Sequence, residues 1–226
     1  STQGRSSAAS DVYKRQEHTL PEPDRIHPVA RTIILLAGPS GSGKSRLARV
    51  SDLPQLRLDD FYRDADSPGL PRRHGMIDWD DVSSWNVDAA VMVLHSLATT
   101  GRARVPRYNL STSQAEGTHV VDVTGHQAIV AEGIFATHLL QPCRGAGLTV
   151  VPIWLDRPRN LNFARRLLRD LEEHRKPPKV LLRRGWALRA AEPEIRAHAI
   201  AAGFRPMGMA GAARLVGRII TDDDRP

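Results

Sequence analysis

Short apolar runs, each followed by glycine or an acidic residue, recur along the chain. The clearest covers residues 32–37 (TIILLA), which are rich in β-branched side chains and lead directly into a glycine-rich loop. Similar runs lie at 55–58, 127–131 and 148–155. Continuous apolar runs of this length are typical of strands buried on both faces of a parallel sheet.

Between these runs the apolar positions follow a helical period. We predict helices over 44–50, 87–98 and 160–174; in the last of these, Leu161, Ala164, Leu168 and Leu171 recur at three- and four-residue spacing. Residues 104–108 and 118–123 are expected to pair as a hairpin. Alternating strands and helices predict an α/β fold with a parallel sheet, whose ligands bind beyond the carboxyl ends of the strands.

The domain organisation follows from length and polarity. A chain of 226 residues suits one α/β domain. Residues 1–30 are polar and without a sustained period, so we expect a disordered tail followed by one domain over 31–226. The pattern assigns no role to residues 186–226.

Amino-acid composition limits the cellular compartment and the binding partners that we expect. Cys143 is the only cysteine and no apolar run approaches the length of a membrane span, so we predict a cytoplasmic protein without a membrane partner. The net charge of +7 comes mainly from arginines scattered along the chain, without interleaved aromatic residues. Nucleic acid is therefore not the expected partner.

The glycine-rich loop after the first run matches the phosphate-binding pattern G-x-x-x-x-G-K-[ST] in full. It consists of Gly38, Pro39, Ser40, Gly41, Ser42, Gly43, Lys44 and Ser45. Its glycines let successive backbone N–H groups turn toward a phosphate, and the following helix N-terminus adds positive potential. Lys44 is expected to reach the β- and γ-phosphates of ATP and Ser45 to bind Mg²⁺, which predicts a nucleotide site.

Acidic residues close the next two strands. Asp59 and Asp60 follow the second run, and Glu132 follows the third. In a parallel sheet these carboxylates emerge at the same edge as the phosphate loop. We expect Asp59 to accept the proton of an attacking hydroxyl and to assist Mg²⁺ binding, and Glu132 to hold Mg²⁺ through water.

In their order along the chain, the motifs GPSGSGKS, LDDFYRD, IDWDD, VPRYN, VAEGIFA and RRLLRD resemble those of the uridine kinase family of P-loop nucleoside kinases, which is related to phosphoribulokinase and pantothenate kinase. The resemblance covers roughly residues 33–175. It implies a P-loop NTPase fold of three α/β/α layers, with a small hairpin substrate region and a helical lid at about 165–185.

The resemblance also implies roles for individual residues. Asp59 corresponds to the general base and Glu132 to the acid on the metal side. Asp78 corresponds to the acid that holds the ribose hydroxyls, and Tyr108 to the aromatic wall beside the base. Three arginines, Arg165, Arg166 and Arg169, correspond to the lid helix. Of these we expect Arg169 to act in catalysis and Arg166 to bind substrate, because guanidinium groups aimed at phosphate oxygens stabilise the transferring charge.

The chain departs from that family around the acceptor. No histidine follows Tyr108 closely, and Ile77 and Leu110 stand where aromatic residues are found in the family. Phosphorylation of a nucleoside 5′-hydroxyl, as in uridine or cytidine, is the leading prediction. The alternatives are a kinase for another small metabolite, of pantothenate or sugar-phosphate type, and a nucleotide-binding regulatory ATPase.

Overall fold

A computed structural model of the protein describes residues 30–172 and 178–222, and within these ranges it leaves aside the side chains of 166–188 and Asp222. Apart from Ala30, the expected tail therefore lies outside the described residues. The described part contains a five-stranded parallel sheet in the spatial order β2-β7-β1-β8-β9. Its strands are β1 (Thr32–Ala37), β2 (Gln55–Arg57), β7 (Ala128–Glu132), β8 (Val150–Leu155) and β9 (Arg205–Met207).

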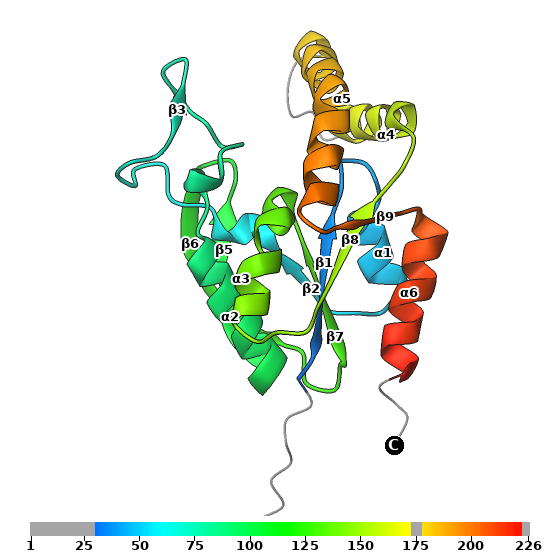
Figure 1. Ribbon diagram of the computed structural model, residues 1–226. Coiled ribbons are helices and arrows are strands. Elements are labelled where there is room, and N and C mark those ends of the chain that lie inside the picture. Colours follow the sequence, from blue (N-terminus) through cyan, green and yellow to red (C-terminus); the bar gives the residue numbers. More distant parts are fainter. Residues whose placement is uncertain (1–29, 173–177, 223–226) are drawn as a thin grey trace, which may run out of the picture.

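The central strand, β1, is buried on both faces, and its side chains alternate between two cores. Ile33 and Leu35 pack with α2 (Val87–Thr100) and α3 (Leu140–Gly145), whereas Ile34 and Leu36 pack with α1 (Lys44–Val50) and α6 (Met209–Asp222). Figure 1 shows the sheet between these two helical layers. The predicted three-layer α/β/α architecture is confirmed.

Helix α2 begins and ends at the residues that its sequence favours. The Asn86 side chain accepts a hydrogen bond from the Ala89 N–H at 3.0 Å and caps the N-terminus. At the other end Gly101 takes a left-handed conformation with φ of 78°, and its N–H donates to the Leu97 carbonyl. Between the caps, the apolar stripe over Ala90, Leu94, Leu97 and Ala98 is buried against the sheet.

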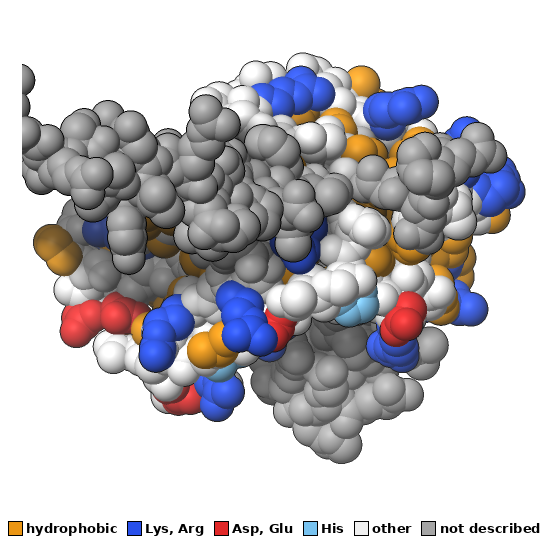
Figure 2. All heavy atoms as spheres, turned by 90° about the horizontal axis from the view of Figure 1, so that it is seen from below, with side chains coloured by type: hydrophobic (Ala, Val, Ile, Leu, Met, Phe, Trp, Pro, Cys, Tyr) orange, Lys and Arg blue, Asp and Glu red, His pale blue; other side chains and the backbone are white. Residues whose placement is uncertain are grey.

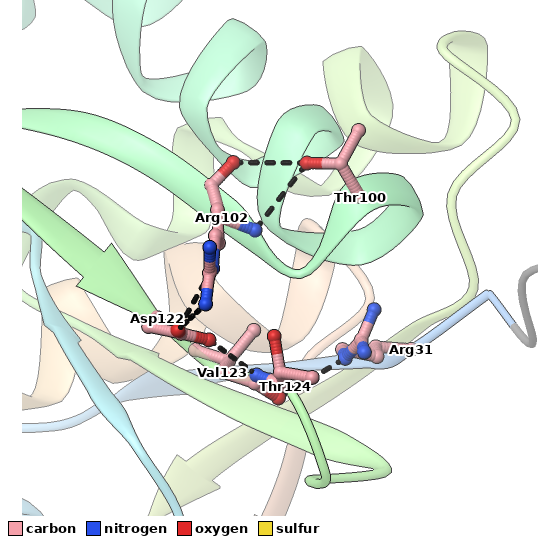
Figure 3. Close-up of polar contacts among 6 residues, drawn as sticks. All are labelled: Arg31, Thr100, Arg102, Asp122, Val123 and Thr124. Atoms are coloured by element: carbon pink, nitrogen blue, oxygen red, sulfur yellow. Dashed lines mark hydrogen bonds and ion pairs between the residues drawn. The ribbon is translucent and has the colours of Figure 1, made fainter.

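The predicted hairpin is present as antiparallel β5 (Arg102–Asn109) and β6 (Gln114–Asp122), with an irregular register near Pro106. Figure 3 shows how its base is fixed. Arg102 forms an ion pair with Asp122 across the hairpin, at 2.7 Å, and Arg31, which precedes β1, donates through Nε to the Val123 carbonyl at 3.2 Å. These bonds tie the hairpin to the beginning of the central strand.

Two segments rise above the end of the sheet where the phosphate loop begins (Figure 1). One is the helical pair α4 (Arg159–Glu172) and α5 (Pro178–Ala201), which covers most of the expected lid, although residues 173–177 lie outside the described range. Asn162 of α4 donates to Glu192 of α5 at 3.0 Å. The other is the two-stranded β3 (Arg72–Arg73) and β4 (Met76–Ile77).

Three short 3₁₀ helices connect these elements in the described residues: η1 (Leu58–Phe61), η2 (Val82–Ser84) and η3 (Ile134–His138). The first directly follows β2 and carries the two aspartates singled out from the sequence. None of the described helices is long and apolar enough to cross a bilayer.

Candidate active site

The loop after β1 has the backbone geometry of a phosphate cradle. Gly38 has φ of 149°, and a Cβ atom there would lie 3.0 Å from the carbonyl oxygen of Leu155 on β8. Gly43 has φ of 99°, in the left-handed region, and it immediately precedes α1. Glycine is required at both positions, at the first by close packing and at the second by backbone conformation. The loop thereby turns into the N-terminus of α1, where backbone N–H groups attract anions.

Two polar side chains lie inside this loop. Lys44 donates through Nζ to the carbonyl oxygens of Gly38, at 2.9 Å, and Pro39, at 3.4 Å. The Ser42 hydroxyl is fully buried, and it has no hydrogen-bond partner among the described residues. A buried hydroxyl without a partner costs stability unless a further group satisfies it. A phosphate oxygen or a water in the loop would fill this need, so the cradle fits a nucleotide.

An acid and a hydroxyl meet beside Lys44. The Ser45 Oγ donates to Glu132 Oε1 at 3.4 Å, and Gln55 on β2 holds the same oxygen at 2.8 Å. These are hard oxygen ligands of the kind that Mg²⁺ prefers, and Mg²⁺ usually adds water and substrate phosphates to one or two carboxylates. The described residues contain no group of three or more acidic, histidine or cysteine side chains arranged for a metal.

Asp59 faces the same place from η1. A Cβ atom added to Gly133, the residue after Glu132, would lie 3.4 Å from Asp59 Oδ1. Burial raises the pKa of Asp59, and the Glu132 carboxylate raises it further. The Arg57 and Lys44 cations act in the opposite direction. A partly buried carboxylate with a raised pKa, within the field of a lysine and a second acid, is a candidate general base.

The neighbouring aspartate is structural. Asp60 is 7% exposed, and its Oδ1 accepts the backbone N–H of Tyr108 at 3.3 Å. This bond fixes the hairpin against η1. Of the two adjacent aspartates, Asp59 is therefore the one whose carboxylate faces Glu132.

An aromatic cluster lies next to Asp59 on the side of β3 and the hairpin. It is centred on Tyr62, whose ring lies 5.6 to 5.8 Å, between centroids, from the rings of Trp79, Tyr108 and Phe135. Burial raises the pKa of Tyr62, as do the negative charges of Asp59 and then Asp80. Tyr62 therefore lies between the candidate base and the segment that follows β4.

The two residues expected to contact the acceptor are both engaged with the protein. The Asp78 carboxylate forms an ion pair with Arg73 of β3 at 3.2 Å. Tyr108 is 6% exposed and donates its hydroxyl to the Arg63 carbonyl at 3.0 Å, which leaves its ring as the part that packs against Tyr62.

The structure describes one of the three expected lid arginines in full. Arg165 lies on α4 and is partly exposed, whereas the side chains of Arg166 and Arg169 lie outside the described residues. Three residues that sequence reasoning missed also border the site: Tyr62, Arg157 and Met209. Tyr62 stood within the quoted LDDFYRD motif, which could have suggested it, but no local pattern marks the other two.

Comparisons with known proteins place this geometry in a family. Residues 33–176 match the model of the phosphoribulokinase / uridine kinase family. A uridine kinase of Aeromonas salmonicida is 30% identical, over 62% of this chain and 69% of its own. A uridine kinase of Haemophilus influenzae is 28% identical over the same shares.

A crystal structure from Silicibacter sp. TM1040, described as a candidate fructose transport system kinase, superposes with a TM-score of 0.52 over 82% of this chain and 91% of its own. At 21% identity this likeness concerns the fold alone. The family match carries the assignment: the chain belongs to the phosphoribulokinase / uridine kinase family, and it is an ATP-dependent kinase.

Proposed function

We propose that this kinase transfers the γ-phosphoryl group of Mg²⁺·ATP to a hydroxyl of a small metabolite, with the 5′-hydroxyl of a nucleoside as the leading acceptor. The observation that carries the proposal is the convergence of Asp59, Glu132 and Ser45 at the loop that holds Lys44. Phosphoryl transfer depends mainly on positioning and on neutralising charge, and this arrangement offers groups for both.

In the proposed reaction Asp59 accepts the proton of the acceptor hydroxyl as its oxygen bonds to the γ-phosphorus. The bond from that phosphorus to the β–γ bridging oxygen breaks, and ADP leaves. Lys44 would exchange its loop carbonyls for β- and γ-phosphate oxygens. Ser45 and Glu132 would hold Mg²⁺, which neutralises charge on the phosphates. Arg165, with Arg166 and Arg169 on the same helix, would close over the phosphates.

Two features support a nucleoside acceptor. Two relatives that are 28% and 30% identical to this chain are named uridine kinases. The aromatic cluster around Tyr62 offers ring faces beside Asp59, suited to packing against a planar base. For this role Asp78 would exchange its ion pair with Arg73 for the ribose hydroxyls. The Arg73 side chain is 76% exposed, so solvent can take over its charge when the pair opens.

A kinase for another small metabolite keeps the same chemistry and changes only the acceptor. A regulatory ATPase would instead hydrolyse ATP without an acceptor. A polynucleotide-dependent ATPase would be expected to gather its basic side chains on one surface. On the face seen from below, the described Lys and Arg side chains lie scattered between hydrophobic and acidic ones (Figure 2). The proposed setting is the cytoplasm, because a single cysteine, Cys143, suits a reducing compartment.

The test is ADP formation from Mg²⁺·ATP with a panel of acceptors: uridine, cytidine, other nucleosides, pantothenate and sugar phosphates. We expect acceptor-dependent ADP formation with a nucleoside and an equal amount of nucleoside 5′-monophosphate. Stimulation by another class alone would retain the kinase and reject the nucleoside. ADP formed at the same rate without any acceptor would reject phosphoryl transfer to a small hydroxyl.

A further inference from the structure

Arg157 lies where β8 leads out of the sheet, next to the phosphate loop. Strand β8 pairs with β1 so that Trp154 stands opposite Ala37, the last residue before the loop. The carbonyl of Leu155 lies close to Gly38. The register of the sheet therefore holds the backbone of Arg157, two residues after Leu155, beside the phosphate loop.

The Arg157 guanidinium lies over Gly43. A Cβ atom built on Gly43 would be 3.9 Å from Arg157 Nη2 and 4.0 Å from Cζ. Gly43 is the left-handed residue from which α1 begins, so this cation faces the exit of the loop, while Lys44 donates to the carbonyls of Gly38 and Pro39 at its entrance.

Two more arginines from other elements lie within electrostatic range. The pKa of Arg157 is lowered, first by burial, then by the charges of Arg165 on α4 and Arg46 on α1. The nearest carboxylate in sequence does not offset them, because Asp156 Oδ2 accepts both Nη2 and Nε of Arg196, at 2.8 and 3.1 Å. Within the described side chains, no ion pair joins an acid to these three arginines.

Three like charges brought together from separate elements repel one another, and an anion bound between them would offset that repulsion. We propose that Arg157, assisted by Arg46 and Arg165, forms a subsite at the exit of the loop for the α-phosphate of the nucleotide, the phosphate that is not transferred. The inference rests on the proposed nucleotide site. It assigns the β- and γ-phosphates to Lys44 and the loop, and it adds a positioning residue that the family motifs do not contain.

The test is direct binding of ADP and ATP, measured by titration calorimetry without an acceptor. Arg157→Gln weakens both nucleotides about tenfold and by equal factors, as loss of one charged hydrogen-bonding group predicts. Arg157→Lys retains the charge and recovers part of the affinity. Arg159→Gln, two residues along and exposed at the start of α4, serves as the matched control and binds within twofold of the wild type.

Kinetics give a second readout. Arg157→Gln raises KM for ATP by a similar factor and leaves kcat at saturating ATP within about threefold, because the α-phosphate keeps its charge through the transfer. Arg46→Gln, on an exposed side chain of α1, weakens ADP binding less than Arg157→Gln. Since Arg46 is exposed, this second variant reports on the subsite even where Arg157→Gln lowers Tm.

Two results would overturn the subsite. The first is ADP binding by Arg157→Gln within twofold of the wild type. The second is a much larger loss for ATP than for ADP, which would place the arginine on the γ-phosphate. The binding experiment needs no acceptor. If no acceptor in the panel stimulates ADP formation but ADP still binds, the proposed reaction is rejected and the α-phosphate subsite is not.

Discussion

The phosphate side and the acceptor side of the site are built in different ways. On the phosphate side, one continuous segment, from β1 through the loop into α1, supplies backbone N–H groups and the Lys44 and Ser45 side chains. On the acceptor side, Tyr62, Trp79, Tyr108 and Phe135 come from four separate segments. Their polar atoms bond mostly to the protein itself: Tyr62 to the Trp79 carbonyl at 3.2 Å and Tyr108 to the Arg63 carbonyl at 3.0 Å.

This difference explains why the reaction is easier to infer than the acceptor. A phosphate is bound by backbone geometry, which a short motif specifies. An acceptor is recognised by the shape of a pocket whose walls meet only in the folded chain. Variants on the two sides should therefore differ in their kinetic effects. Those on the phosphate side should slow the reaction with every acceptor, whereas those on the acceptor side should weaken the use of the acceptor alone.

The largest effect is expected from Lys44→Met. Loss of a cation that stabilises the transferring phosphoryl group should reduce kcat by about 10³-fold, close to 4 kcal/mol of transition-state stabilisation, with every acceptor that works. Steady-state ADP formation measures it. Arg49→Met, exposed on the same helix, is the control and should stay within twofold. Equal activity of Lys44→Met and Arg49→Met would contradict the role of Lys44 in stabilising the transferring phosphoryl group.

Gly133→Ala should come next. The added Cβ would lie 2.7 Å from Leu58 Cβ and 3.4 Å from Asp59 Oδ1, so η1 must shift and carry Asp59 away from the acceptor hydroxyl. A displacement of about 1 Å is expected to lower kcat/KM by about 10²-fold. Gly145→Ala is the matched control, because its Cβ would meet no atom within 4 Å. Similar kinetics for the two variants would show that the position of Asp59 is not critical.

A smaller and more selective effect is expected from Tyr62→Phe. The change removes the hydrogen bond to the Trp79 carbonyl, which costs about 1 kcal/mol and loosens the segment after β4. We expect KM for the acceptor to rise about fivefold while KM for ATP is unchanged. An equal rise in both KM values would mean that the two sides of the site are not separable in this way.

The smallest effect concerns stability and pH. Because burial and Glu132 raise the pKa of Asp59 in the folded protein, its ionised form destabilises the fold above that pKa. Below the ordinary value of 3.8 the group is protonated in both the folded and the unfolded state, and this cost vanishes. Asp59→Asn should therefore raise Tm by about 2 °C at pH 7, with the gain fading as the pH falls toward 3.8. A gain that grows on acidification would contradict the raised pKa.

The part of the fold that the sequence predicts is the part with strong local patterns. The apolar run of β1 and the helix over 44–50 lie at their predicted positions, and β7 and β8 lie within two residues of theirs. Strand β9 was missed because its three residues, Arg205–Met207, have no apolar period; their pairing with β8 makes them a strand. Helices α3 and α6 also went unpredicted, and only the first part of α5 falls within the expected helical lid. Helix α6 covers one face of the sheet through Ala212 and Val216.

The residues of the site also divide into those that local sequence patterns predict and those that only the folded chain brings together. The meeting of Asp59, Glu132 and Ser45 could be expected, because the carboxyl ends of neighbouring parallel strands share an edge. The ion pair between Asp78 and Arg73 could not, since it depends on the two-residue strands β3 and β4. Arg157 could not be singled out among scattered arginines, because only the register of β8 brings it to Gly43.

The most direct test of the central claim is to compare binding and turnover in Asp59→Asn. An amide in place of the carboxylate cannot accept the hydroxyl proton, while the phosphate loop is unchanged. We predict an ADP dissociation constant within about threefold of the wild type, and acceptor-dependent ADP formation reduced by about 10³-fold. Turnover within tenfold of the wild type would contradict the assignment of Asp59 as the base.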